Sequence, residues 1–123
     1  MRDRACLAGQ VILVVEGMAG PFARRLQAAL ERMGAETRLA RTPAHAREHA
    51  GRYDFSAAVI GCDGPFDTIE FRQLRSELGG MPLLLYGTAP PPYVSLRAAQ
   101  FLATSAPTKA DDIVRAVTRM LFS

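Results

Sequence analysis

The chain is poor in several residue types, and each shortage excludes a class of protein. It has no tryptophan, two cysteines and a single lysine, Lys109. Cys6 and Cys62 are too few for a disulfide framework and lack the spacing of a zinc ligand set, so we expect two free thiols. No apolar run approaches the roughly 20 residues of a membrane-spanning helix. Residues 1–9 are too short and too polar for a signal peptide, and we expect a cytoplasmic protein.

The positive charge comes almost entirely from arginine. The formal net charge is +3 and the sequence pI is about 9.3. The arginines are scattered along the chain without interleaved aromatic residues, which favours a solvated surface over a nucleic-acid site. No glycine-rich phosphate loop follows the first apolar run, residues 11–15, so a nucleotide-binding fingerprint is absent. We expect neither nucleic acid nor membrane as a partner.

Length and hydropathy predict one folded domain. The chain has 123 residues, of which 49% are hydrophobic. This length supports one hydrophobic core and is too short for two. We therefore expect a single domain over residues 1–123, with no output domain attached.

Hydrophobic periodicity predicts alternating strands and helices. Continuous or alternating apolar runs are typical of strands, whereas apolar residues three and four apart are typical of helices. The expected strands are residues 11–15, 36–41, 55–61, 83–86 and 100–104, with 36–41 at an edge of the sheet. The expected helices run from Pro21 to Met33, from Pro43 to about Gly51, from Thr68 to Leu78, from Tyr93 to Ala99 and from Asp111 to Leu121. This order indicates an α/β fold: a doubly wound, five-stranded parallel sheet with five helices.

In such a fold, a functional site lies at the carboxyl ends of the strands. The residues that the sequence places there are Glu16, Gly17, Gly61, Cys62, Gly87 and Thr88. Converging polar side chains are few in this group. No nucleophile, base and orienting group come together, so we do not expect an enzyme.

Three segments resemble response-regulator receiver domains of the CheY-like superfamily. The run 11–15 followed by Glu16 is similar to the family's first strand with its acidic pair. The third strand, 55–61, ends where the family has its phosphoacceptor aspartate, and Pro107 matches a proline that follows the family's lysine. The resemblance implies a flavodoxin-like receiver fold and a role in bacterial two-component signal transduction or a phosphorelay.

The residues that carry phosphorylation in the family are replaced here. One acid, Glu16, stands where the family has two, and Gly61 stands at the phosphoacceptor position. The lysine position is Ala106 when counted from Pro107, or Thr104 when counted from Phe101. The family's hydroxyl residue is Gly87 in one register and Thr88 in another, and both registers stay open. The sequence therefore predicts a pseudo-receiver that accepts no phosphate and needs no cofactor.

Three local patterns have a chemical and a structural interpretation. Glu16 and Asp63 are weak candidates for holding Mg²⁺, but a lone carboxylate binds Mg²⁺ poorly, and we favour a Glu16 that caps a loop or helix. His45 and His49 could share a transition metal, but an exposed helix face is favoured. Cys62 could be a reactive thiol, but a small residue filling the pocket is favoured.

We expect the protein to act through protein contacts. The resemblance places the interaction and switch face around Tyr93, Arg97, Phe101 and Arg115, with Phe101 at the family's switch aromatic. A phenyl ring has no hydroxyl to anchor it outside, so an inward ring is favoured. The expected partner is a histidine kinase, another regulator or a second copy of the chain. The alternative function is a small-ligand or thiol-redox sensor that uses the emptied pocket and Cys62.

Overall fold

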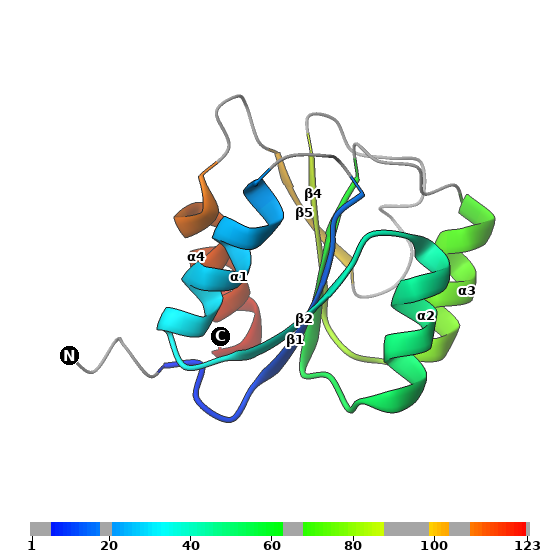
Figure 1. Cartoon of the computed structure of the whole chain (residues 1–123), viewed down its shortest axis with the longest axis horizontal. Helices are drawn as coiled ribbons and strands as arrows, with labels where there is room; N and C mark the ends of the chain where they lie inside the picture. The colour runs from blue at the N-terminus through cyan, green and yellow to red at the C-terminus, as the bar shows by residue number, and fades with distance from the viewer. Residues whose placement is uncertain (1–5, 18–20, 63–67, 88–98, 104–108, 123) are drawn as a thin grey trace.

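Five parallel strands form the centre of the molecule (Figure 1). The structure is a computed structural model, and it describes residues 6–17, 21–62, 68–87, 99–103 and 109–122. The strands are β1 (Val11–Val15), β2 (Glu36–Ala40), β3 (Ala57–Gly61), β4 (Leu83–Gly87) and β5 (Ala99–Ala103). Their order in the sheet is β2-β1-β3-β4-β5, so the chain reverses its direction of travel across the sheet after β2. The carboxyl ends of β1 and β3 flank this switch point.

Two helices cover each face of the sheet. They are α1 (Phe22–Arg32), α2 (Pro43–Arg52), α3 (Thr68–Leu78) and α4 (Ala110–Phe122). Helices α1 and α4 lie side by side on one face, and α2 and α3 lie on the other (Figure 1). Each pair encloses its own core, because alternate residues of the central strands point to opposite faces. Val14, Val59 and Leu84 pack toward α1 and α4, whereas Leu13 and Ile60 pack toward α2 and α3.

Local sequence signals explain where the first two helices begin and end. Pro21 precedes α1, and Gly34 follows it with a φ of 100°, a conformation that favours glycine. Thr42 precedes α2 and its hydroxyl accepts a hydrogen bond from the backbone N–H of His45 at 3.1 Å. Helix α2 starts at Pro43 as the sequence predicts, whereas α1 starts at Phe22, one residue after the predicted Pro21.

The predicted strands are confirmed in number and in order along the chain, with small differences at their ends. β3 begins at Ala57 rather than Phe55, because the Phe55 side chain is buried in the core beside α2 and α3. β2 ends one residue earlier than expected and β4 one residue later, at Gly87. Strand β2 does lie at an edge of the sheet.

The fifth expected helix is not among the four that the structure describes. Residues 93–98 lie outside the described residues. Ala99, its expected last residue, is instead the first residue of β5, so the prediction is wrong at that position. The last helix, α4, is one residue longer at each end than expected. Within the described parts of the chain, no helix combines the length and apolar character needed to cross a membrane.

Candidate functional site

Three strands bring Glu16, Gly61 and Tyr86 together at the carboxyl edge of the sheet. Glu16 directly follows β1, Gly61 is the last residue of β3, and Tyr86 lies in β4. Val15 pairs with Ile60, and Gly61 pairs with Tyr86. The three residues therefore lie next to one another although Tyr86 is 70 positions from Glu16 in the chain.

The Glu16 side chain is buried and anchored. Its exposed fraction is 6%, and the Tyr86 hydroxyl donates a hydrogen bond to its Oε2 at 2.7 Å. The Tyr86 ring is also buried and packs against the ring of Phe22, with centroids 5.9 Å apart. A buried carboxyl group without a donor would be costly, and the hydroxyl of Tyr86 offsets part of that cost.

The space next to Gly61 is occupied by the carboxyl group of Glu16. A Cβ atom at position 61 would lie 2.8 Å from Glu16 Oε2 and 3.0 Å from both Cδ and Oε1. These separations are shorter than van der Waals contact. A side chain at position 61 would therefore require the Glu16 carboxyl group to shift.

Two neighbouring residues, Cys62 and Gly87, take part in the backbone pairing of the sheet. The Cys62 N–H donates to the Tyr86 carbonyl oxygen at 2.8 Å, which continues the pairing of β3 with β4. Its thiol is half-buried, and Sγ lies 3.7 Å from the carbonyl oxygen of Ile60. Gly17 is exposed, and Gly87 pairs with Ala103 of β5.

The structure gives Glu16 a role that the sequence did not predict. Its carboxylate accepts a hydrogen bond from the Tyr86 hydroxyl, and its expected role as a cap of a loop or helix stays a prediction. Its carboxyl group also fills the space that the sequence left as an emptied pocket at Gly61. The sensor interpretation loses its proposed cavity there, and no other observation favours it.

The described residues at this edge do not fit a magnesium site. Mg²⁺ in proteins is held by several oxygen ligands. Within the described ranges, no group of three or more His, Cys, Asp or Glu side chains lies together, and the Glu16 carboxyl group is engaged by Tyr86. The other predicted residues of this site lie outside the described residues: Asp63, Thr88, Thr104 and Ala106.

The expected interaction face is described only in part. Arg115 is exposed on α4 and forms an ion pair with Asp112. The Phe101 backbone lies in β5 opposite Leu85. Tyr93 and Arg97 lie outside the described residues. Arg115 thus lies on α4 and the Phe101 backbone in β5, whereas their role in an interaction face and the inward position of the Phe101 ring stay predictions.

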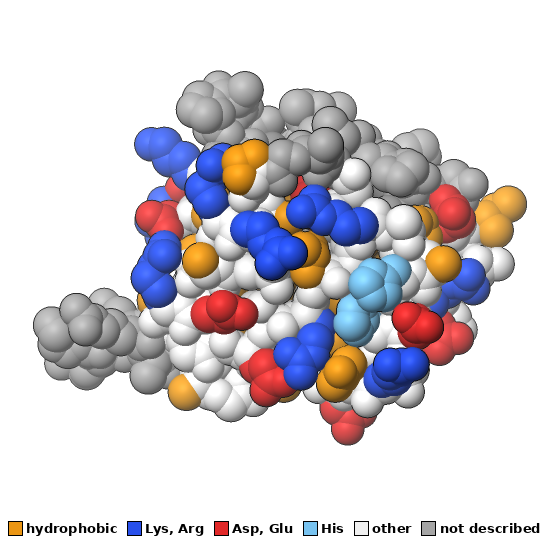
Figure 2. Space-filling model, in the orientation of Figure 1, with side chains coloured by type: hydrophobic (Ala, Val, Ile, Leu, Met, Phe, Trp, Pro, Cys, Tyr) orange, Lys and Arg blue, Asp and Glu red, His pale blue; other side chains and the backbone are white. Residues whose placement is uncertain are grey.

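His45 and His49 lie together on α2, as Figure 2 shows, but they do not form a uniformly exposed face. Their ring centroids are 4.5 Å apart, and His49 is half-buried between His45 and Tyr53. The guanidinium carbon of Arg38 lies 4.6 Å from the centre of the Tyr53 ring. Within the described residues, Nε2 of His49 is buried without a hydrogen-bond partner. Partial burial, followed by the nearby charge of His45, lowers the pKa of His49.

Sequence reasoning missed Tyr86. The run 83–86 was interpreted as a buried strand, in which tyrosine counts as another β-forming residue. A signal was present, because a tyrosine inside a buried strand needs a partner for its hydroxyl group. That partner is Glu16, the one acidic residue expected at the end of the neighbouring strands.

Comparison with known proteins identifies the fold. No protein-family model matches the sequence, and no curated protein matches it. Among solved structures, the chemotaxis protein CheY4 of Vibrio cholerae superposes with a TM-score of 0.77 at 20% identity, covering 93% of this chain and 100% of that chain. The receiver domain of Francisella response regulator 1452 has a TM-score of 0.72 at 17% identity, covering 92% and 97%.

A third similar structure holds a metal ion. It is the receiver domain of sensor histidine kinase PA1611 from Pseudomonas aeruginosa PAO1, with a magnesium ion coordinated in its active-site cleft. Its TM-score is 0.67 at 24% identity, covering 94% of this chain and 100% of that chain. These similarities show that the chain has the flavodoxin-like fold of CheY-like receiver domains.

Proposed function

We propose that this chain is a cytoplasmic pseudo-receiver that works in two-component signalling through protein contacts, without accepting a phosphoryl group. The observation that carries the proposal is the pair formed by Gly61 and Glu16. Position 61 ends β3 at the switch point of a receiver fold and has no side chain, and the carboxyl group of Glu16 occupies the adjacent space. The place of the expected acceptor is thus filled by a group held by Tyr86.

The chemistry of aspartyl phosphorylation supports the same proposal. The reaction needs a carboxylate nucleophile, a divalent cation held by oxygen ligands, and a positive group for the phosphoryl oxygens. Glycine offers no carboxylate. In the sequence registers considered above, Ala106 or Thr104 replaces the lysine, and neither side chain carries a charge.

The proposed mode of action is occupancy of a docking face by a domain held in one state. Its partner is a histidine kinase, another regulator or a second copy of the chain. The face comprises Tyr93, Arg97, Phe101 and Arg115, because exposed arginine and aromatic residues often dominate protein interfaces. Replacing Arg97 and Arg115 by glutamate should abolish association, whereas Arg24→Glu and Gln27→Glu on α1 should not. The opposite pattern would move the docking face to α1.

The decisive experiment is phosphoryl transfer measured by intact-mass spectrometry. The protein is incubated with acetyl phosphate and Mg²⁺ beside a receiver domain that keeps its aspartate. We expect an adduct on that control protein and none on this chain. Gly61→Asp alone should also stay unlabelled, because the new side chain would meet Glu16 and the lysine is missing. A single phosphoryl adduct on the unaltered chain would overturn the proposal.

A further inference from the structure

The two histidines of the chain lie against each other on α2. His45 is exposed and His49 is half-buried, and their ring centroids are 4.5 Å apart (Figure 2). They stand four positions apart, the spacing at which two side chains share one face of a helix. The pair therefore brings two imidazole groups to one place at the surface of α2.

The two ring nitrogens of His49 differ in their surroundings. The side chain forms a hydrogen bond with the backbone of Leu39 in β2. Within the described residues, Nε2 is buried and has no hydrogen-bond partner. The bond to the Leu39 carbonyl oxygen is therefore donated by Nδ1, which leaves the lone pair of a neutral imidazole on Nε2. A buried polar atom in this position needs a partner that the described residues do not supply.

This is the arrangement of a histidine that binds a metal ion. Such a histidine usually donates its other ring N–H to a carbonyl or carboxylate oxygen, which fixes the direction of the lone pair. Because a metal–nitrogen bond measures about 2.0–2.1 Å, two nitrogens on one ion lie no more than about 4 Å apart. With the rings already at 4.5 Å, a rotation of the exposed His45 side chain is enough to bring a nitrogen beside Nε2 of His49.

The backbone of α2 holds both positions in place. The Thr42 hydroxyl accepts a hydrogen bond from the His45 N–H at 3.1 Å, and the His49 carbonyl oxygen accepts one from the Tyr53 N–H at 3.0 Å. The Tyr53 ring also packs against the His49 ring, with centroids 5.8 Å apart. Only the His45 side chain has to be ordered when an ion binds, so the entropic cost of binding is small.

We propose that His45 and His49 together bind one divalent transition-metal ion of the kind that prefers imidazole: Cu²⁺, Ni²⁺ or Zn²⁺. The protein supplies two nitrogens and water completes the coordination, because no three His, Cys, Asp or Glu side chains come together in the described ranges. For nitrogen ligands, Cu²⁺ binds more tightly than Ni²⁺ or Zn²⁺. Mg²⁺ takes oxygen ligands and does not fit this pair.

Aromatic stacking alone explains only part of the arrangement. The rings of His45, His49, Tyr53 and Phe55 follow one another, each in contact with the next. Stacking accounts for the positions of these rings, but it gives the Nε2 atom of His49 no partner. A shared metal ion accounts for both observations.

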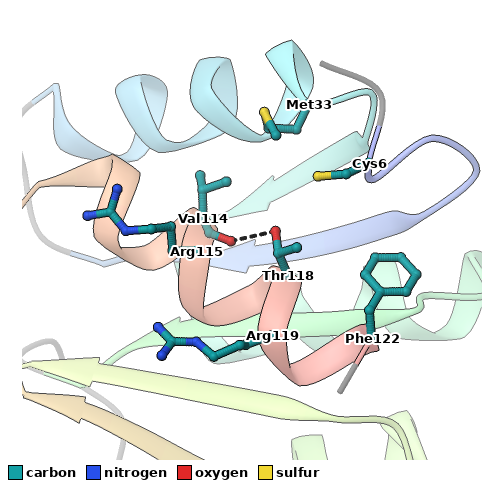
Figure 3. A pocket seen from close by; sticks show the side chains of 7 residues that line it. All are labelled: Cys6, Met33, Val114, Arg115, Thr118, Arg119 and Phe122. Carbon is teal, nitrogen blue, oxygen red and sulfur yellow. Dashed lines mark hydrogen bonds between the residues drawn. The ribbon is translucent and has the colours of Figure 1, made fainter. Parts of the chain in front are cut away.

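Two thiols compete for such an ion and are removed in the test. Cys6 lines a hollow beside α4, together with Met33 and Phe122 (Figure 3), and it packs against the core under α1 and α4. Cys62 packs against the core under α2 and α3. All measurements therefore use the full chain with Cys6→Ser and Cys62→Ser, because thiolates bind Zn²⁺ and copper.

The test is calorimetric titration of this protein with nickel chloride at pH 7.5. We expect one Ni²⁺ per chain, and a rise in the Tm with Ni²⁺ that Mg²⁺ at the same concentration does not give. His45→Gln and His49→Gln should each raise the dissociation constant by about tenfold or more, since even the groups behind a metal ligand are worth that much. Circular dichroism checks that each variant is folded.

The matched control keeps two histidines and changes their spacing. His45→Gln combined with Arg47→His places the second imidazole two positions from His49, and residues two apart do not face each other on a helix. This variant should bind Ni²⁺ as weakly as His45→Gln alone, although it has lost a positive charge. His45 is exposed, so its substitution should leave the free energy of unfolding within about 0.5 kcal/mol.

Nuclear magnetic resonance locates the ion. A substoichiometric amount of paramagnetic Cu²⁺ should broaden the ring-proton signals of His45 and His49 together. The proposal is overturned if the protein takes up no Ni²⁺, if the variant with the changed spacing binds as tightly as the original pair, or if Cu²⁺ broadens the signals of only one ring. In those cases the two rings are an aromatic stack beside Tyr53 and no more.

This inference goes beyond the proposed function and does not depend on it. A phosphoryl adduct on the chain would remove the pseudo-receiver role and leave the histidine pair untouched. Failure to bind Ni²⁺ would remove the metal site and leave the phosphorylation block untouched.

Discussion

Glu16, Gly61 and Tyr86 depend on one another. Glycine leaves the space that the Glu16 carboxyl group fills, and the Tyr86 hydroxyl provides that buried group with a hydrogen bond. Changing one member therefore alters the environment of the other two. Such coupling makes substitutions in contact non-additive, which double-mutant cycles can measure.

Gly61→Ala should lower the free energy of unfolding by about 1–3 kcal/mol, the usual cost of adding a methyl group to a packed site. The new Cβ would lie 2.8 Å from Glu16 Oε2 and push it away from Tyr86. In a Glu16→Ala background the same change should cost much less, because the carboxyl group is gone. Urea unfolding of the two single variants and the double variant measures the difference.

Gly80→Ala is the matched control for that cycle. A Cβ at Gly80 would meet nothing within 4 Å. Its effect should be neutral or stabilising by up to about 1 kcal/mol, because alanine restricts the unfolded chain. Equal costs for Gly61→Ala with and without Glu16 would show that the carboxyl group is not what position 61 meets.

Tyr86→Phe should also destabilise the fold, by about 1–3 kcal/mol, because it removes a buried donor from the Glu16 carboxyl group. The ring and its contact with Phe22 are kept. Thermal and urea unfolding measure the loss. Tyr53→Phe is the comparison: Tyr53 is 37% exposed, and the effect of the substitution should stay within about 0.5 kcal/mol. A similar loss for both variants would contradict the special role of the Tyr86 hydroxyl.

At this scale the sequence predicted part of the site. Glu16 and Gly61 were expected as neighbours because parallel strands end at a common edge. The direction of the Glu16 side chain was not predictable, since it depends on a hydroxyl 70 residues away and on the register of β3 against β4. The same register could not be read from the apolar run 83–86, in which each residue suits a buried strand.

The helices and strands themselves were largely predictable, because their ends carry local signals. Pro21, Gly34 and Thr42 act within one or two turns of the chain. The start of β3 is not determined by a local sequence signal. Ser56 donates its N–H to the Val11 carbonyl oxygen, and Phe55 turns into the core, so tertiary packing decides where the strand begins.

The second helix is held to the edge strand by a polar and aromatic cluster that should make stability depend on pH. His49 is half-buried, and its pKa is lowered, first by burial and next by His45. The charge of Glu48 raises the pKa of His49, whereas the charge of Arg38 lowers it. His49 binds its proton less tightly in the folded protein than in the unfolded chain. Its contribution to the free energy of unfolding is therefore fully present above about pH 6.5, the ordinary histidine pKa, and is lost as the pH falls below that value.

His49→Gln isolates this contribution. Urea unfolding at pH 7.5 and 5.5 should show a smaller loss of stability in the variant than in the unaltered chain. His45→Gln should keep most of the pH dependence, because His45 is exposed. If the free energy of unfolding falls between pH 7.5 and 5.5 as much in His49→Gln as in the unaltered chain, another group causes the acid sensitivity.

The whole molecule has the fold of receiver domains, but glycine stands at position 61, where the resemblance to that family leads us to expect an aspartate. The edge of the sheet where the fold places a site is filled by Glu16. Exposed arginines lie on both helix layers of the described part, for example Arg25 on α1 and Arg72 on α3. The loss of phosphorylation chemistry stays a prediction, and it rests on residue types at strand ends.

Magnesium should therefore stabilise the molecule little. A ligand raises stability only in proportion to its preferential binding to the native state, and the Glu16 carboxyl group is already engaged by Tyr86. Thermal unfolding in millimolar Mg²⁺, compared with sodium chloride of equal ionic strength, should change the Tm by less than about 3 °C, on the order of 1 kcal/mol for a domain of this size. A larger rise would mean that Glu16, together with Asp63, binds the ion. Tyr86→Phe then distinguishes the two cases, because freeing Glu16 from its donor should make the magnesium effect larger only if that carboxyl group is a ligand.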